Sequence, residues 1–152
     1  MLGLGDAVRE LPREFRGELP RDVSRAEVFC AGCLVVEGLP FEKDAEQASR
    51  LAREETFAGW PLVVLHDDAK VALKAADFLW ATWTRFEPAS DIYAAETKVH
   101  RHHLAYHGPI VIDARMKPGY PDELIVREDI AQLVDNRWRE YFPQGLHERE
   151  AV

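Results

Sequence analysis

One stretch near the middle of the chain, residues 60–93, constrains the fold more than any other. It opens with the short apolar run Leu-Val-Val-Leu at 62–65, whose β-branched residues are typical of a buried strand. Asp67 and Asp68 follow the run and can cap the next element. Over residues 70–83 the apolar side chains recur mostly at helical spacing. This pattern predicts a helix with a broad apolar face, which needs a sheet beneath it.

The same stretch indicates where the helix ends and what comes next. Pro88 lacks a backbone donor and restricts Glu87, so we expect the helix to stop just before them. Asp91-Ile92-Tyr93 then begins another extended run. The stretch therefore predicts a strand, a helix and a strand joined by a right-handed connection.

Length and composition restrict the class of protein. A chain of 152 residues can build one sizeable core and is too short for two ordinary domains. Its net charge of -8 argues against non-specific binding to nucleic acid or to anionic membranes. No apolar run approaches the roughly 20 residues of a membrane span, and the first residues lack the basic start of a signal peptide. We expect a cytoplasmic protein with no nucleic-acid or membrane partner, whose two cysteines are reduced.

The remaining segments predict one layered α/β domain with a largely parallel sheet and helices on its faces. Residues 1–25 contain Leu-Pro-Arg twice and are expected to form an irregular arm with one short helix over 6–11. The domain itself is expected to occupy residues 26–142, and a charged tail residues 143–152. Its other predicted elements are strands over 28–36 and 109–113, a half-exposed strand or loop over 92–106, and helices over 44–57 and 125–141.

Two cysteines, Cys30 and Cys33, form a C-x-x-C pair that could be half of a zinc site or a redox dithiol. No second ligand pair at a matching spacing accompanies them. Redox pairs usually lie at a helix start, where the helix dipole lowers the thiol pKa, whereas these two fall in a predicted strand. Their side chains would then point to opposite faces, and packing in the core is the favoured interpretation.

Four histidines crowd into eight residues further along the chain. On a strand, His100 and His102 would share a face, as two metal ligands might. Arg101 between them would repel a cation, and no acidic residue at a familiar spacing completes a ligand set. A polar, pH-sensitive surface is therefore favoured over a metal site built with Cys30 and Cys33.

Polar side chains at the end of the 62–65 strand and at the end of the following helix are candidates for a substrate cleft or an interface: Asp67, Asp68, Thr84 and Arg85. Open parallel sheets bind ligands at the carboxyl ends of their strands. The alternative, which the residues favour, is that the aspartates cap the helix while Arg85 pairs with Glu87 or Asp91. No phosphate-binding or nucleophile-elbow motif is present, so the residues alone show no reactive centre.

Several motifs taken together resemble the carboxyl-terminal domain of the UbiD family of decarboxylases. They are VVLHDD at 63–68, FLWATWTR at 78–85 and EPASDI at 87–92, preceded by CLVV at 33–36 and followed by GPIVIDA at 108–114 with Lys117-Pro118. The resemblance covers residues 26–140, and Glu87 replaces the aspartate that is usual in the family.

The resemblance implies a part of an enzyme without its reactive centre. The family uses prenylated FMN to decarboxylate aromatic or α,β-unsaturated acids, and its flavin site and catalytic carboxylates belong to a middle domain that has no counterpart in this chain. The end domain packs against its twin in oligomers and closes over the active-site cleft. We therefore expect a small, stand-alone accessory subunit of a UbiD-like decarboxylase or carboxylase, which is not catalytic alone.

This subunit would complete the cleft and assemble with a separate large catalytic chain that holds prenylated FMN and metal ions, and it would also self-associate. The expected contact residues are Leu2, Leu4, Phe15, Trp80, Trp83 and Trp138. One alternative is a non-catalytic, homo-oligomeric binding or regulatory module on the same fold. Another is a metal protein that uses the two cysteines and the histidine cluster.

Overall fold

The computed structural model describes residues 10–121 and 127–142. The chain divides into two units, Met1–Tyr120 and Pro121–Val152. Among the described residues, the first unit contains every strand and the second contains one helix. Within the described residues, no helix has the length and apolar content needed to cross a bilayer.

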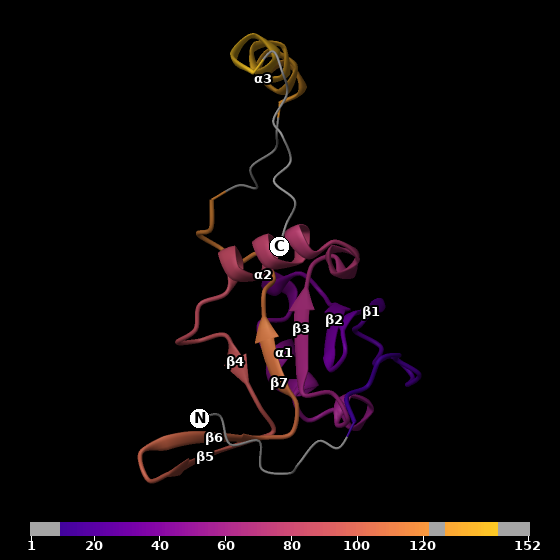
Figure 1. The fold of residues 1–152 in the computed structure, drawn as a ribbon. Helices are drawn as coiled ribbons and strands as arrows, with labels where there is room; N and C mark the ends of the chain where they lie inside the picture. The colour runs from indigo at the N-terminus through magenta and orange to yellow at the C-terminus, as the bar shows by residue number, and fades with distance from the viewer. Residues whose placement is uncertain (1–9, 122–126, 143–152) are drawn as a thin grey trace. The chain divides into compact units, whose positions relative to one another are not determined.

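A five-stranded sheet organises the first unit (Figure 1). The three central strands are parallel, and each edge strand runs antiparallel to its neighbour. In spatial order the strands are β1 (Arg25–Cys30), β2 (Cys33–Glu37), β3 (Leu62–His66), β7 (Ile110–Asp113) and β4 (Ile92–Tyr93). The predicted α/β fold with a largely parallel sheet is confirmed.

The sheet is covered on both faces, which explains why its central strands are almost wholly apolar. Alternate residues of β2, β3 and β7 pack on one face against α1 (Gln47–Leu51) and the aromatic pair Phe57 and Trp60. The intervening residues pack on the other face against η3 (Ala69–Leu73) and α2 (Ala75–Arg85). A single layer of strands between helical elements is the result.

The predicted strand over 28–36 is wrong, because the segment folds as a hairpin of β1 and β2. The chain reverses at Ala31-Gly32, where Gly32 has φ +82°, a conformation that side chains other than glycine rarely adopt. The turn could not be recognised from the sequence, because both strands of the hairpin face the same core. The apolar run therefore continues through the two-residue turn. Cys30 and Cys33 are consequently opposite each other rather than on opposite faces of one strand.

Two predicted helices are shorter than expected. The helix over 44–57 is reduced to α1, preceded by the 3-10 turn η1 (Phe41–Lys43) and followed by η2 (Glu55–Phe57). The helix over 70–83 is divided into η3 and α2 by Lys74, which is extended at φ -134° and ψ 123°. Apolar periodicity does not distinguish 3-10 from α-helical turns over so few residues.

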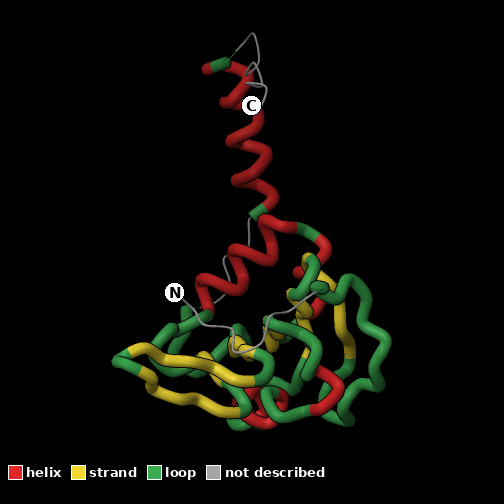
Figure 2. The backbone as a smooth tube through the Cα atoms, turned by 60° about the horizontal axis from the view of Figure 1, so that its bottom comes forward, coloured by secondary structure: helices red, strands yellow, loops and turns green. Residues whose placement is uncertain are grey.

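The connection that follows α2 also differs from the prediction. β4 pairs antiparallel with β7, so the strand after α2 does not run parallel to β3. The parallel crossover runs from β3 to β7 instead and includes a separate hairpin of β5 (Glu96–His100) and β6 (His103–His107). This hairpin lies beyond the amino-terminal end of β7 (Figures 1 and 2).

Residues 10–24 form neither helix nor strand, as expected of an irregular arm, and the arm packs on the domain. The ring of Phe15 lies 5.8 Å from that of Phe57 and 6.5 Å from that of Trp60. Phe15, expected to contact a partner, therefore contributes to the chain's own core. The expected helix over 6–11 lies almost entirely outside the described residues, as do Leu2, Leu4 and the tail at 143–152.

The second unit contains α3 (Glu128–Tyr141), close to the predicted helix over 125–141, whose first two residues lie outside the described part. Glu128 and Asp129 occupy its first turn, where the helix dipole favours negative charge. Its apolar side chains recur at helical spacing and are 45–52% exposed: Ile130, Leu133, Val134 and Trp138.

Gly38 follows β2 directly, at a point where a side chain does not fit. A Cβ there would collide with Gln47 Oε1 and Leu65 Cδ1, whereas a Cβ at Gly59 would meet nothing within 4 Å. We expect Gly38→Ala to lower the free energy of unfolding by about 1–3 kcal/mol, the usual cost of overpacking a core. Urea denaturation would measure it, with Gly59→Ala as the matched control. Equal effects of the two substitutions would contradict the packing described for this edge.

Candidate functional site

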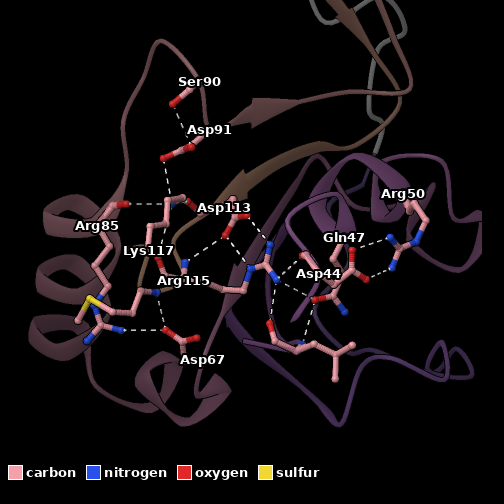
Figure 3. Close-up of polar contacts among 12 residues, drawn as sticks. Asp44, Gln47, Arg50, Asp67, Arg85, Ser90, Asp91, Asp113, Arg115 and Lys117 are labelled. Atoms are coloured by element: carbon pink, nitrogen blue, oxygen red, sulfur yellow. Dashed lines mark hydrogen bonds and ion pairs between the residues drawn. The ribbon is translucent and has the colours of Figure 1, made fainter. Parts of the chain in front are cut away.

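The carboxyl ends of β3 and β7 meet at one edge of the sheet, beside α2 (Figure 1). Charged side chains from three parts of the chain gather there (Figure 3). Asp67 follows β3, Arg85 ends α2, and Asp113, Arg115 and Lys117 lie at or just after the end of β7. This edge is where open parallel sheets bind ligands, and where the sequence predicted a cleft or interface.

Two of the four predicted site residues contact each other. Arg85 Nη1 lies 3.4 Å from Asp67 Oδ2, so Arg85 contacts the carboxylate that follows β3. The same oxygen of Asp67 accepts a hydrogen bond from the backbone N–H of Met116 at 2.7 Å. Asp67 thus links the end of β3 to the segment that follows β7.

The other two predicted residues satisfy nearby backbone groups. Asp68 caps η3, because its Oδ1 accepts from the N–H of Lys70 at 2.9 Å. Thr84 Oγ1 donates to the carbonyl of Trp80 at 2.7 Å, one turn back in α2. Asp68 and Thr84 therefore have structural contacts that account for them.

A fully buried ion pair lies beside this contact. Arg115 donates to both oxygens of Asp113, from Nε at 2.9 Å and from Nη2 at 2.6 Å, and both side chains have no exposed surface. Arg115 Nη1 donates further to the carbonyls of Leu39 and Asp44, and to Gln47 Oε1. One guanidinium thereby fastens the end of β7 to the segment that leads into α1 (Figure 3).

Lys117 and Tyr120 join the end of α2 to the same edge. Lys117 Nζ lies 3.0 Å from Asp91 Oδ2 and donates to the carbonyls of Asp113 and Arg85. The hydroxyl of Tyr120 also donates to the Arg85 carbonyl, at 2.9 Å. These two donors satisfy one of the carbonyls left unpaired at the end of a helix.

His66, the last residue of β3, is a buried neighbour of these charges, with 2% of its surface exposed. Its Nδ1 accepts from the N–H of Asp68 at 3.0 Å, and its Nε2 lies 3.4 Å from Arg85 Nη1. Burial lowers the pKa of His66 below its ordinary value of 6.5, and the nearby Arg85 guanidinium lowers it further against the opposing effect of Asp67. The imidazole is therefore neutral near neutral pH.

The depressed pKa of His66 predicts a pH dependence of stability. As the pH falls below 6.5, the unfolded chain takes up a proton that the folded imidazole excludes, so the free energy of unfolding should decrease. At higher pH this contribution is fully present. We expect His66→Gln to remove this part of the slope, as measured by urea denaturation between about pH 5 and about pH 8. Parallel slopes for the two proteins would contradict this role of His66.

The sequence reasoning assigned no role to Asp113, Arg115 or His66, which form much of this edge. Asp113 and Lys117 lie in the motif that carried the family resemblance, which is the signal that could have drawn attention to them. Arg115 had no such signal, because its acceptors at residues 39, 44 and 47 are remote in sequence.

The positive and negative side chains at this edge offset each other in charge and are paired within the chain. Arg115 and Lys117 use their donors on the chain's own carboxylates and carbonyls. A rigid frame of this kind can position the loops that follow the strands.

The two cysteines are not brought together with the histidine cluster. Cys30 and Cys33 lie on the β1–β2 hairpin at one edge of the main sheet, whereas the histidine cluster belongs to the separate β5–β6 sheet. His102 lies in the turn of that hairpin at φ +67°, so the prediction that it shares a strand face with His100 is wrong. Within residues 10–121 and 127–142, no three His, Cys, Asp or Glu side chains form a group that could hold a metal ion.

Comparison with known proteins gives several related sequences, although no family model matches the chain. An uncharacterised protein of Chlamydia trachomatis serovar D is 39% identical over 143 residues, which cover 93% of this chain and 24% of that protein. A 4-hydroxybenzoate decarboxylase subunit from Chlamydia pneumoniae is 37% identical over 143 residues, again 93% of this chain and 24% of the relative. The chain thus spans about a quarter of the length of the curated relatives it matches.

Among solved structures, the open form of the vanillic acid decarboxylase of Sedimentibacter hydroxybenzoicus is 16% identical, with a TM-score of 0.46. The alignment covers 80% of this chain and 30% of that chain. A similarity of this size does not bear on function. The resemblance noted in the motifs at 33–36, 63–92 and 108–118 is confirmed at the level of sequence, because the chain is 37% identical over 93% of its length to a relative named as a decarboxylase subunit.

Proposed function

We propose that this chain is the accessory part of a UbiD-like decarboxylase or carboxylase, that it completes the active-site cleft, and that it docks on a separate catalytic chain. The observation that carries the proposal is the 37% identity to the 4-hydroxybenzoate decarboxylase subunit of Chlamydia pneumoniae over 93% of the chain. That match covers 24% of the relative, so the larger part of the relative lies outside the aligned region. We assign the chemistry to that larger part.

The edge network supports a structural role for this chain within the enzyme. Its charged side chains pair with one another, and the buried Asp113–Arg115 pair has no exposed surface at all. Such a network fixes the loops after β3 and β7 without supplying a reacting group. Those loops, held rigidly, are what a neighbouring chain would need in order to form one wall of a shared cleft.

The cofactor proposal follows from the same edge. A flavin phosphate needs backbone N–H groups or cationic side chains that are open to it, and the cations of this edge are engaged within the chain. Prenylated FMN, with its metal ions, is therefore proposed to reside in the catalytic chain. When bound there it would supply the electron sink for loss or gain of carbon dioxide.

One face of α2 is proposed to dock on the catalytic chain. Its inner face buries Phe78, Ala81 and Thr82 against the sheet. Its outer face leaves Trp80 64% and Trp83 57% exposed. Tryptophan is strongly enriched among residues that dominate binding energy, and two neighbouring exposed tryptophans on one helix are typical of a docking surface.

Self-association is proposed for the second unit. A 14-residue helix is marginally stable by itself in water, so α3 gains stability from burial of its apolar stripe. A second copy of the chain offers an identical stripe, and two such stripes can pack as an antiparallel or parallel pair. The exposed apolar stripe of α3 also favours the second candidate function, a homo-oligomeric module that does not bind a catalytic chain.

Affinity isolation from the native host tests the proposal. The tagged chain should recover a larger polypeptide that absorbs in the flavin region, and the complex should release carbon dioxide from 4-hydroxybenzoate or vanillate. Sedimentation of the purified chain in the presence of the same acids addresses the homo-oligomeric alternative. A defined oligomer that binds these acids and recovers no flavin protein would contradict the accessory role and support the alternative.

A further inference from the structure

The tip of the β1–β2 hairpin places the two cysteines of the chain directly opposite each other. Val28 pairs with Leu34, and regular pairing from there would put Cys30 opposite Gly32. A bulge between Val28 and Cys30 shifts the register by one residue, so that Cys30 pairs with Cys33 instead. The bulge therefore determines that the two side chains meet.

The register of the pair is compatible with the distance requirements of a disulfide bond. Opposed residues of an antiparallel pair have Cα atoms about 4.5–5.5 Å apart and side chains on one face. A disulfide needs Cα atoms about 4.4–6.8 Å apart. The register pairs Cys30 directly with Cys33, so the backbone already places the two residues as the bond requires.

The two thiols differ in access to solvent. Cys30 is exposed and Cys33 is buried. Burial, with a smaller contribution from the neighbouring Cys30, raises the pKa of the Cys33 thiol to about 12. Cys30 is therefore the thiol that is accessible to a dissolved oxidant. Cys33 is not accessible to it and reacts only after Cys30 has reacted.

We propose that Cys30 and Cys33 form a reversible disulfide, with Cys30 as the attacking thiol and Cys33 as the resolving thiol. The oxidant is a small-molecule disulfide such as oxidised glutathione. The Cys30 thiolate attacks one of its sulfurs, the sulfur–sulfur bond breaks, and the leaving thiolate takes a proton. Cys33 then attacks the Cys30 sulfur, loses its proton and expels the second glutathione thiolate. Two protein thiols are oxidised, and one glutathione disulfide is reduced to two thiols.

The disulfide bond would affect the N-terminal arm, because the arm is hydrogen-bonded to this turn. The N–H of Gly32 donates to the carbonyl of Pro12 at 2.8 Å, and a Cβ at Gly32 would lie 3.0 Å from Leu11 Cδ2. Closing a ring across Ala31-Gly32 restricts the turn to which the arm is bound. The oxidised form should therefore hold residues 10–24 more firmly than the reduced form, and proteolysis of the arm should slow.

Intact-mass analysis of the full chain after incubation with oxidised glutathione tests the proposal. The wild-type protein should lose about 2 Da, with no glutathione retained, and dithiothreitol should reverse the loss. Cys33→Ser should stop at a glutathione adduct on Cys30, because the resolving thiol is missing. Cys30→Ser should react at least about 10-fold more slowly, because its remaining thiol is buried and protonated. Far-UV circular dichroism of the two variants verifies that they are folded.

Three outcomes of the mass analysis would overturn the proposal. The first is a stable glutathione adduct on the wild-type chain, the second is a disulfide between two chains, and the third is no reaction at all. Elemental analysis accompanies the measurement, because zinc bound by the dithiol in the purified chain would identify the pair as metal ligands instead.

Discussion

Replacement of Arg115 with methionine should lower the free energy of unfolding by about 3–5 kcal/mol, because the change leaves the Asp113 carboxylate buried without its partner. Neither side chain of the pair has any exposed surface. The substitution also removes the donors to the carbonyls of Leu39 and Asp44, so the segment before α1 loses its attachment to β7. Since domains of this size are stable by only about 5–15 kcal/mol, urea denaturation should show a large fall in midpoint.

An exposed arginine provides the matched control for Arg115. Arg50 is 48% exposed and pairs with Asp22 and Asp44. Arg50→Met should cost less than about 1 kcal/mol, because solvent screens such pairs. The double variant Asp113→Leu/Arg115→Met should recover part of the loss, since it removes both charges. If Arg115→Met cost no more than Arg50→Met, the central role of the buried pair at this edge would be wrong.

Replacement of Trp80 and Trp83 with glutamine should weaken binding to the catalytic chain by at least about 100-fold, because an interface residue of this kind often contributes about 2 kcal/mol or more. The free energy of unfolding of the isolated chain should change by less than about 0.5 kcal/mol, since both side chains are largely exposed. Surface plasmon resonance against the isolated catalytic polypeptide would measure the affinity, and urea denaturation the stability.

Asp77 provides the control on the same helix. It lies in the first turn of α2 and makes only an exposed ion pair with Lys74 among the contacts that the structure describes. Asp77→Asn should change the affinity by less than about threefold. If the two tryptophan substitutions left the affinity intact, the docking surface would lie elsewhere on the chain. If the two tryptophan substitutions unfolded the chain, the assignment of Trp80 and Trp83 to an exposed face of α2 would be wrong.

The sequence predicted the centre of the sheet well. Residues 62–66 and 110–113 are strands as expected, because a short β-branched run between turn residues has few alternatives when both faces are buried. The hairpins were missed for opposite reasons. Gly32 lies inside an apolar run that conceals the turn, and the other turn uses Arg101 and His102, both at positive φ, where the sequence offers no glycine.

The candidate site could be predicted only in part. Asp67 and Arg85 were named together as candidates, although pairing of Arg85 with Glu87 or Asp91 was favoured, and the structure brings Asp67 and Arg85 into contact. The buried arginine could not be found in this way. Arg115 pairs with a residue two positions away but is enclosed by acceptors more than 65 residues distant, a relationship that periodicity and local motifs do not encode.

The most direct test of the accessory role compares carbon dioxide release from carboxyl-labelled 4-hydroxybenzoate by three samples. They are the purified chain alone, the complex isolated from the native host, and the same preparation made with the Trp80 and Trp83 substitutions. We predict release by the complex alone, and loss of both the catalytic chain and the activity in the substituted preparation. Sustained release by the purified chain alone would contradict the account.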